Sequence, residues 1–236
     1  MRPPKLDPFT IYGAAYVLFL YGPLLLIPIF SFNDSIYVAF PLKGFTLQWY
    51  EQMFGNRFLL EAGLNSLKLA SAVALVSTAV GLPAARALTR YRFAGRGFVT
   101  GMIAVPLVVP GIVFGIALLI MFRRFLDIQL SLYTVGAGHL LICVPFATLT
   151  LLSRLEGFDR SLEEASHNLG ENAWHTFWRV TFPLALPGVL ASMLLTFTVC
   201  FDEVVLAFFL SGTEQTLPIY IFSQLRFPQR LPSVLA

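Results

Sequence analysis

Charged residues are scarce in this 236-residue chain, because lysine, arginine, aspartate and glutamate together make up only 12% of it. Apolar residues make up 57%, and the mean hydropathy is +0.75. A soluble domain of this length carries more polar surface, so the composition predicts a polytopic membrane protein. The net charge of +3 does not indicate a nucleic-acid partner, since lysine and arginine gather in the cytoplasmic loops of membrane proteins.

Residues that bind metals or catalyse reactions are also few, with two cysteines and three histidines. Cys143 and Cys200 both fall in apolar stretches, which argues against a disulfide framework or a zinc site. Glu163, Glu164 and His167 have the spacing of a weak metal or protease motif, but they lie in a charged loop rather than inside a membrane helix. The chain also lacks the Gly-x4-Gly-Lys-Ser/Thr sequence of a P-loop. We therefore predict no metal, no catalytic site and no ATP site in this chain.

Five apolar stretches are long enough to cross roughly 30 Å of hydrocarbon as helices. They cover residues 11–32, 64–85, 98–122, 132–152 and 186–210. With a cytoplasmic N-terminus, the inner segments hold nine lysines and arginines and the outer ones six, which favours that orientation. We expect one transmembrane domain over residues 1–236 and a sixth helix beyond residue 236, with a natural five-span protein as the alternative.

The connection between the fourth and fifth stretches, residues 153–185, contains a spaced motif. Glu164-Ala165-Ser166 is followed by three residues, then Gly170, then nine residues, and then Val180-x-Phe182-Pro183. Ser161 and Glu164 have the spacing of a capping box, 162–169 suits a short helix, and Gly170 can end that helix in the left-handed conformation.

A second helix is predicted after Gly170, because Trp174, Phe177 and Trp178 recur at helical spacing. Pro183 and Pro187 are expected to interrupt that helix at the start of the next span. We expect the two tryptophans to brace the loop against the spans rather than to contact a partner.

The spacing of this loop resembles the EAA loop of ABC-importer permeases, whose pattern is Glu-Ala-Ala, x3, Gly, x9, Ile, x, Leu, Pro. Ser166, Val180 and Phe182 depart from that pattern by small changes. The resemblance implies an all-α, type I ABC importer permease fold in which a separate cytoplasmic ATPase dimer binds ATP and drives the loop. The implied ATPase-coupling residues are Glu163, Glu164, Ala165, Ser166 and Gly170.

Further segments are similar to the second permease subunit of the spermidine/putrescine importer family, namely 44–50, 65–67, 106–111, 201–212 and 217–218. The resemblance implies a bacterial inner-membrane subunit that pairs with a homologous permease and receives a small cationic solute from a periplasmic binding protein. Related permeases for amino-acid derivatives, opines, phosphonates, thiamine or ferric iron remain alternatives, as does a membrane scaffold that transports nothing.

Two adjacent carboxylates, Asp202 and Glu203, fall within the fifth apolar stretch. A charge near the centre of a membrane helix costs roughly 2.5 to 3.5 kcal/mol, so the pair needs water, a partner or a ligand. We predict a cation pathway there, with Phe201 and Phe209 available for cation–π contacts. Adjacent helical residues point about 100° apart, so only one carboxylate is expected to face the pathway, and we favour Asp202. An interhelical ion pair or a polar contact with the partner permease is the structural alternative.

Pro106, Pro110 and Gly111 interrupt the third stretch and free backbone carbonyls where the helix lines a cavity. They predict a hinge for alternating access. Ordinary proline and glycine residues accommodated by helix packing are the alternative.

Overall fold

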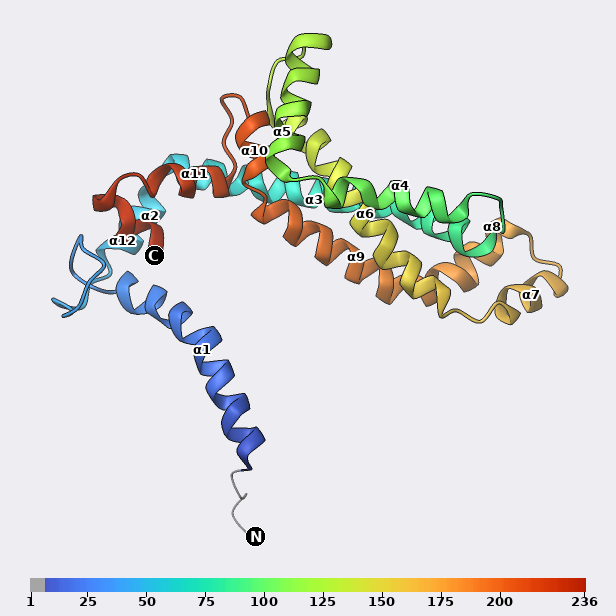
Figure 1. Cartoon of the computed structure of the whole chain (residues 1–236), viewed down its shortest axis with the longest axis horizontal. Coiled ribbons are helices and arrows are strands. Elements are labelled where there is room, and N and C mark those ends of the chain that lie inside the picture. The colour runs from blue at the N-terminus through green and yellow to red at the C-terminus, as the bar shows by residue number, and fades with distance from the viewer. Residues whose placement is uncertain (1–6) are drawn as a thin grey trace. The chain divides into compact units, whose positions relative to one another are not determined.

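The computed structural model describes residues 7–236 (Figure 1). Helices account for all regular structure in this range, apart from an isolated bridge between Asn33 and Phe45. The chain divides into two compact units. One combines the described part of Met1–Glu61 with Tyr220–Ala236, and the other is Ala62–Ile219.

The first unit contains α1 (Pro8–Ser31), α2 (Gln48–Gly55), η3 (Pro228–Arg230) and α12 (Leu231–Leu235), and α12 packs against both α1 and α2. The Trp49 indole donates a hydrogen bond to the backbone oxygen of Asn33 at 2.9 Å. A proline begins α1, where its missing N–H leaves no helical bond unmade. Nearly all side chains of α1 are apolar and exposed, which suits a helix surrounded by lipid.

The second unit carries the remaining helices. They are α3 (Arg57–Arg90), α4 (Arg96–Val108), α5 (Gly111–Ile120), η1 (Met121–Phe125), α6 (Leu132–Glu156), α7 (Ser161–Asn168), α8 (Ala173–Thr176), η2 (Phe177–Thr181), α9 (Phe182–Asp202), α10 (Val205–Leu210) and α11 (Leu217–Gln224), of which α3 and α11 continue into the first unit. Both η1 and η2 are π-helical turns.

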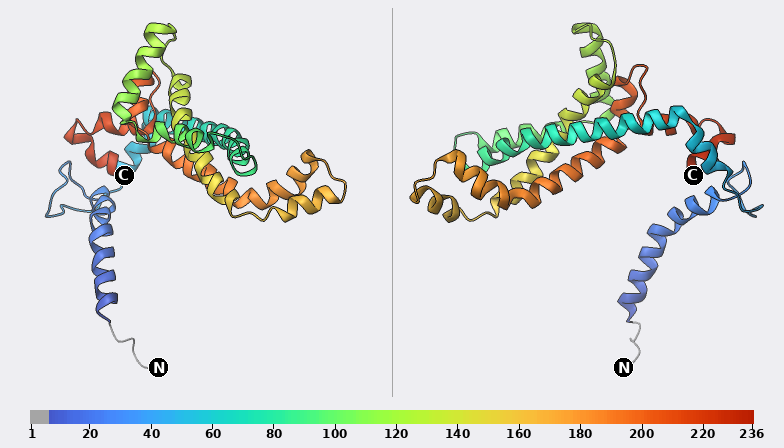
Figure 2. Two further views of the ribbon diagram at one scale, coloured as in Figure 1. Left: turned by 45° about the vertical axis from the view of Figure 1, so that its right-hand side comes forward. Right: turned by 180° about the vertical axis from the view of Figure 1, so that it is seen from behind.

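The long helices α3, α6 and α9 run side by side in this unit (Figures 1 and 2). Leucine and alanine side chains from all three helices form one buried cluster, which includes Leu88, Leu151 and Ala185. Gly81 brings α3 close to α6, because a Cβ atom added there would lie 3.0 Å from both the Ala147 Cβ and the Thr148 nitrogen. Small residues that let helix backbones approach closely are typical of membrane helix pairs.

Among residues 7–236, four helical stretches are long and apolar enough to cross a membrane: α1, α3, α6 and the continuous segment Ala173–Asp202. A fifth span exists if α4 and the helix from Gly111 to Phe125 count together, although they are bent by 94°. The five predicted spans therefore correspond to four helical stretches and one bent pair.

The third predicted span, 98–122, is not one continuous helix, and the interruption that the sequence predicts at Pro110 and Gly111 is confirmed. Residue Val109 has an extended backbone (φ −69°, ψ 129°) and Pro110 caps α5, so the helix breaks at these two residues. The physical reason is that a residue before proline is pushed out of the α-helical region. Pro106, by contrast, lies inside α4 without ending it.

The fifth predicted span, 186–210, is wrong as a single helix. The helix α9 begins at Phe182, before the predicted start, and ends at Asp202. It ends there because Glu203 adopts an extended backbone (φ −72°, ψ 107°) before α10 starts at Val205. The predicted interruption at Pro183 and Pro187 does not occur. Pro183 directly follows the π-helical turn η2, Pro187 lies inside α9, and the helix continues through both.

Candidate functional site

The helix α7 lies within the 153–185 loop and confirms the short helix predicted at 162–169. The predicted capping box does not form, because Ser161 is already the first helical residue and the N-cap position is Arg160. Asp159 takes the capping role instead. The Ser161 amide donates to Asp159 Oδ1 at 2.9 Å, and this hydrogen bond lowers the pKa of the exposed Asp159 carboxyl.

Gly170 ends α7 in the left-handed conformation, with φ of +88°, as the sequence predicts. The Gly170 amide donates to the His167 oxygen at 2.9 Å, and the Glu171 amide donates to the Ser166 oxygen at 3.2 Å. Together these two bonds make a Schellman motif, which satisfies carbonyls at the end of α7. The chain can therefore turn back toward α8 without leaving polar backbone groups unpaired.

The inward face of α7 is held by polar side chains. Ser166 is 8% exposed, and its hydroxyl lies 3.0 Å from the hydroxyl of the fully buried Thr176. Glu163 accepts a hydrogen bond from the Thr181 hydroxyl at 2.6 Å and pairs with Arg90 at 3.0 Å. The serine that departs from the EAA pattern thus makes a specific contact within the loop.

The outward face of α7 carries Glu164 and Ala165, and both are exposed. The two adjacent glutamates grouped by the sequence therefore separate, with Glu163 turned inward and Glu164 turned outward. An exposed carboxylate in the first turn of a helix also interacts favourably with the helix dipole. Glu164 and Ala165 are thus among the exposed residues of the loop.

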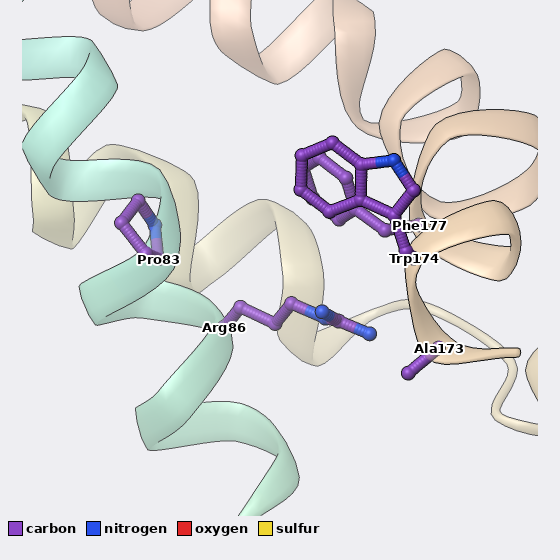
Figure 3. A pocket seen from close by; sticks show the side chains of 5 residues that line it. All are labelled: Pro83, Arg86, Ala173, Trp174 and Phe177. Carbon is purple, nitrogen blue, oxygen red and sulfur yellow. The ribbon is translucent and has the colours of Figure 1, made fainter.

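The helix α8 begins at an Asn172 cap, whose side-chain oxygen accepts from the His175 amide at 2.9 Å. Beyond it, Arg86 of α3 reaches toward Phe177, with its guanidinium carbon 5.2 Å from the ring centroid (Figure 3). These side chains line an open pocket of about 300 Å³ together with Pro83, Ala173 and Trp174. The arginine and aromatic ring form a cation–π contact that joins α3 to η2.

The tryptophans of the loop pack mainly on other aromatic residues. Trp178 lies 5.1 Å from Phe177 and 5.0 Å from Phe182, measured between ring centroids. Trp174 is 67% exposed and Trp178 is 47% exposed. Phe177, rather than either tryptophan, packs against the cluster shared by α3, α6 and α9.

Asp202 and Glu203 lie at the break between α9 and α10, and their surroundings differ. Asp202 is exposed. Glu203 Oε1 accepts hydrogen bonds from the amides of Val205 at 2.8 Å and Leu206 at 3.1 Å. Its carboxylate therefore satisfies the first amides of α10. The sequence leaves one carboxylate of the pair a structural role, but it does not predict this cap.

The aromatic residues predicted beside this pair lie on opposite sides of the break. Phe201 stacks on Phe197 with ring centroids 5.7 Å apart, and both pack against the buried cluster around Cys200. Phe209 lies on α10 and faces α5, because a Cβ atom added at Gly115 would be 2.6 Å from its ring. Phe201 and Phe209 therefore pack in two different clusters.

Gly111, one of the three predicted hinge residues, lies next to the acidic break. Gly111 begins α5 and lies close to Val205, which begins α10. A Cβ atom added at Gly111 would be 3.6 Å from the Val205 side chain. The helices α5 and α10 pack against one another. Two interrupted helical stretches therefore meet at their breaks.

Three features of the site were missed by sequence reasoning: the pairing of Arg90 with Glu163, the bond from Thr181 to Glu163, and the capping role of Glu203. The first two join residues far apart in the chain, and no local spacing predicts them. The last depends on where α9 ends, although a glutamate followed by an apolar helical segment is a usable signal.

A family model described as "Binding-protein-dependent transport system inner membrane component" matches residues 77–236. The chain belongs to this family. As a member of the family, it is a non-catalytic inner-membrane subunit of an ABC transporter, and its fold is that of an ABC importer permease.

Similar permeases and solved transporters agree with this membership. The chain is 37% identical to the spermidine/putrescine transport system permease protein PotC of Haemophilus influenzae, over 91% of this chain and 81% of that protein. It is 33% identical to the putrescine transport system permease protein PotI of Escherichia coli, over 88% of this chain and 76% of that protein. Its fold matches a bacterial ABC transporter involved in the import of alginate, with a TM-score of 0.72 at 18% identity over 100% of this chain and 92% of the other.

Proposed function

We propose that this permease subunit forms, with a homologous permease, the membrane path for a small cationic solute such as spermidine or putrescine. The observation that carries the proposal is the 37% identity to a spermidine/putrescine permease over 91% of the chain. The exposed Asp202 carboxylate at a helix break supports it, since an ammonium group is the complement of such a site.

The transport cycle that we propose is alternating access driven from outside this chain. A periplasmic binding protein delivers the solute, and a cytoplasmic ATPase dimer binds and hydrolyses ATP. Movement of the ATPase reaches the permease through α7, whose outward face presents Glu164 and Ala165 and whose end is set by Gly170. Pro110 precedes α5 and Glu203 precedes α10, and we take these two breaks as the points about which α5 and α10 move.

The experiment is uptake by reconstituted complexes. Vesicles holding this permease, its homologous partner and the ATPase should accumulate labelled spermidine or putrescine when ATP is inside and binding protein is outside. Omitting ATP or the binding protein should remove the uptake. Complexes that hydrolyse ATP in response to the binding protein but accumulate neither polyamine would contradict the proposed substrate.

A different small solute is the second candidate. The chain is also 34% identical to a probable molybdenum ABC transporter permease protein of Haloferax volcanii, over 71% of this chain and 65% of that protein. Competition separates the two candidates. An excess of unlabelled polyamine should block the binding-protein-dependent uptake of the transported solute only if polyamines are that solute.

A further inference from the structure

Arg90 and Glu163 form an ion pair that joins the end of α3 to the first turn of α7. The distance from Arg90 Nε to Glu163 Oε2 is 3.0 Å, and the two side chains are only 13% and 12% exposed. Water screens a pair at this depth poorly, so removing one partner leaves the other charge uncompensated. The pair therefore fixes where α7 begins relative to α3.

The second carboxylate oxygen of Glu163 contacts a different element. The Thr181 hydroxyl donates to Glu163 Oε1 at 2.6 Å, and Thr181 is 1% exposed. Thr181 is the last residue of η2 and directly precedes α9. One carboxylate thus ties α7 to the ends of two long helices at once.

Other contacts restrain the same junction. The Arg160 guanidinium, one residue before α7, donates to the Thr89 oxygen near the end of α3 at 2.5 Å. The Arg90 guanidinium carbon lies 5.6 Å from the Phe158 ring centroid. These contacts hold the residues just before α7 to the end of α3, so they restrain the same junction as the pair between Arg90 and Glu163.

We infer that Arg90, Glu163 and Thr181 are positioning residues that transmit movement of α7 to α3 and α9, an inference that rests on the proposed coupling to an ATPase. Glu163 acts through its two intramolecular partners, not by contact with the ATPase. The exposed residues of α7 remain the surface that the ATPase meets. This assignment separates Glu163 from Glu164 by mechanism as well as by position.

The test uses the assembled complex and conservative variants. Glu163→Gln removes the charge and Thr181→Val removes the donor, and the double variant Arg90→Glu with Glu163→Arg reverses the pair. Glu156→Gln is the matched control, because Glu156 makes a 3.0 Å ion pair with Arg96 that is exposed, at 54% and 39%. The readouts are the stimulation of ATP hydrolysis by the purified binding protein with its own ligand, amide exchange in α7, and the amount of assembled permease.

Glu163→Gln and Thr181→Val should speed exchange of the α7 amides by about tenfold, because a local anchor is lost while the spans stay folded. They should lower the stimulation of hydrolysis by about threefold or more at equal assembly. The reversed pair should regain at least half of the stimulation lost in Glu163→Gln, and Glu156→Gln should match the wild type.

Unchanged exchange of the α7 amides in Glu163→Gln would overturn the anchoring of α7 by Arg90, Glu163 and Thr181. Faster amide exchange with unchanged stimulation of ATP hydrolysis would overturn the role of this anchor in coupling. A loss explained entirely by less assembled permease would also overturn that role. Failure of the substrate proposal gives a different result, because the wild-type complex would hydrolyse ATP in response to its binding protein but take up no polyamine. The comparison among the variants would still test the anchoring of α7 by Arg90, Glu163 and Thr181.

Discussion

Asp202 and Glu203 are neighbours in the chain, but only Glu203 has hydrogen-bond partners that explain its charge. Asp202 is exposed at the break between α9 and α10. A carboxylate attracts an ammonium group 4 Å away by about 1 kcal/mol in water and by about 4 kcal/mol at an effective dielectric of 20. These values correspond to roughly fivefold and more than a hundredfold in affinity.

We therefore expect Asp202→Asn to lower polyamine uptake by about fivefold or more, while assembly and basal ATP hydrolysis stay normal. Glu203→Ala should instead reduce the yield or thermal stability of the subunit, because the cap of α10 is lost at a cost of about 0.5 to 2 kcal/mol. Uptake in reconstituted vesicles and melting of the purified complex separate the two effects. Normal uptake in Asp202→Asn would remove the acidic residue from the solute path.

Gly170 is the residue at which backbone conformation itself is the requirement. A non-glycine residue at φ of +88° costs about 1 to 2 kcal/mol, and a β-branched side chain fits there worst. Gly170→Val should therefore lose most ATP-driven uptake while the subunit still inserts into the membrane. Gly157→Ala is the control in the same loop, since Gly157 has φ of −79° and an added Cβ meets no atom closer than 3.9 Å. Wild-type uptake by Gly170→Val would show that the turn is not needed for coupling.

At the scale of elements, the contact between α3 and α6 depends on a missing side chain. Gly81 leaves no room for a Cβ atom beside Ala147 and Thr148, so Gly81→Val should destabilise the second unit by about 1 to 3 kcal/mol. Gly63→Ala on the same helix should not destabilise the fold, because no atom lies within 4 Å of the added Cβ and alanine favours a helix. Thermal unfolding of the purified subunit in detergent measures both, and equal melting temperatures would contradict the packing argument.

The elements also show which features follow from local sequence. The spans were predictable because apolar length is a local property, and so was the turn at Gly170, because few residues adopt positive φ. Pro110 predicts where the helix bends after Val108, but it does not predict the angle of 94°. That angle depends on how α5 packs against α10. The capping box at Ser161 failed because Asp159 competes for the same helix start.

The candidate site was predicted less well, because its important pairs are long-range. Glu163 and Glu164 both lie in the first turn of α7, and local sequence does not distinguish them. Only the packing of α7 against α8 and η2 turns Glu163 toward Arg90 and leaves Glu164 exposed. In the same way, Glu203 looks like a buried charge until α9 is known to end at Asp202. Sequence patterns identify the segment that carries the function but not the direction of its side chains.

At the scale of the whole molecule, the proposed orientation places the N-terminus and the 153–185 loop in the cytoplasm. A reporter fused after Arg92, between α3 and α4, should be cytoplasmic, and one fused after Phe45, between α1 and α2, should be outside. Accessibility of the two reporters in intact cells tests this expectation. The reverse labelling would put α7 on the side away from ATP and contradict the proposed coupling.

The π-helical turn Phe177–Thr181 makes the length of the loop a mechanical dimension. A π turn closes hydrogen bonds from residue i to i+5 and so holds one more residue than an α turn. Removing one residue would restore α geometry at this turn and leave the flanking segments in nearly the same orientation, because the π turn holds that residue as an insertion. Removing a second residue would rotate everything before the turn by about 100° around the axis of α9. The exposed edge of α7 would then point elsewhere, and its contacts with Arg90 and Thr181 would be lost. The loop can therefore lose one residue between Gly170 and Phe182, but not two, before the direction of α7 changes.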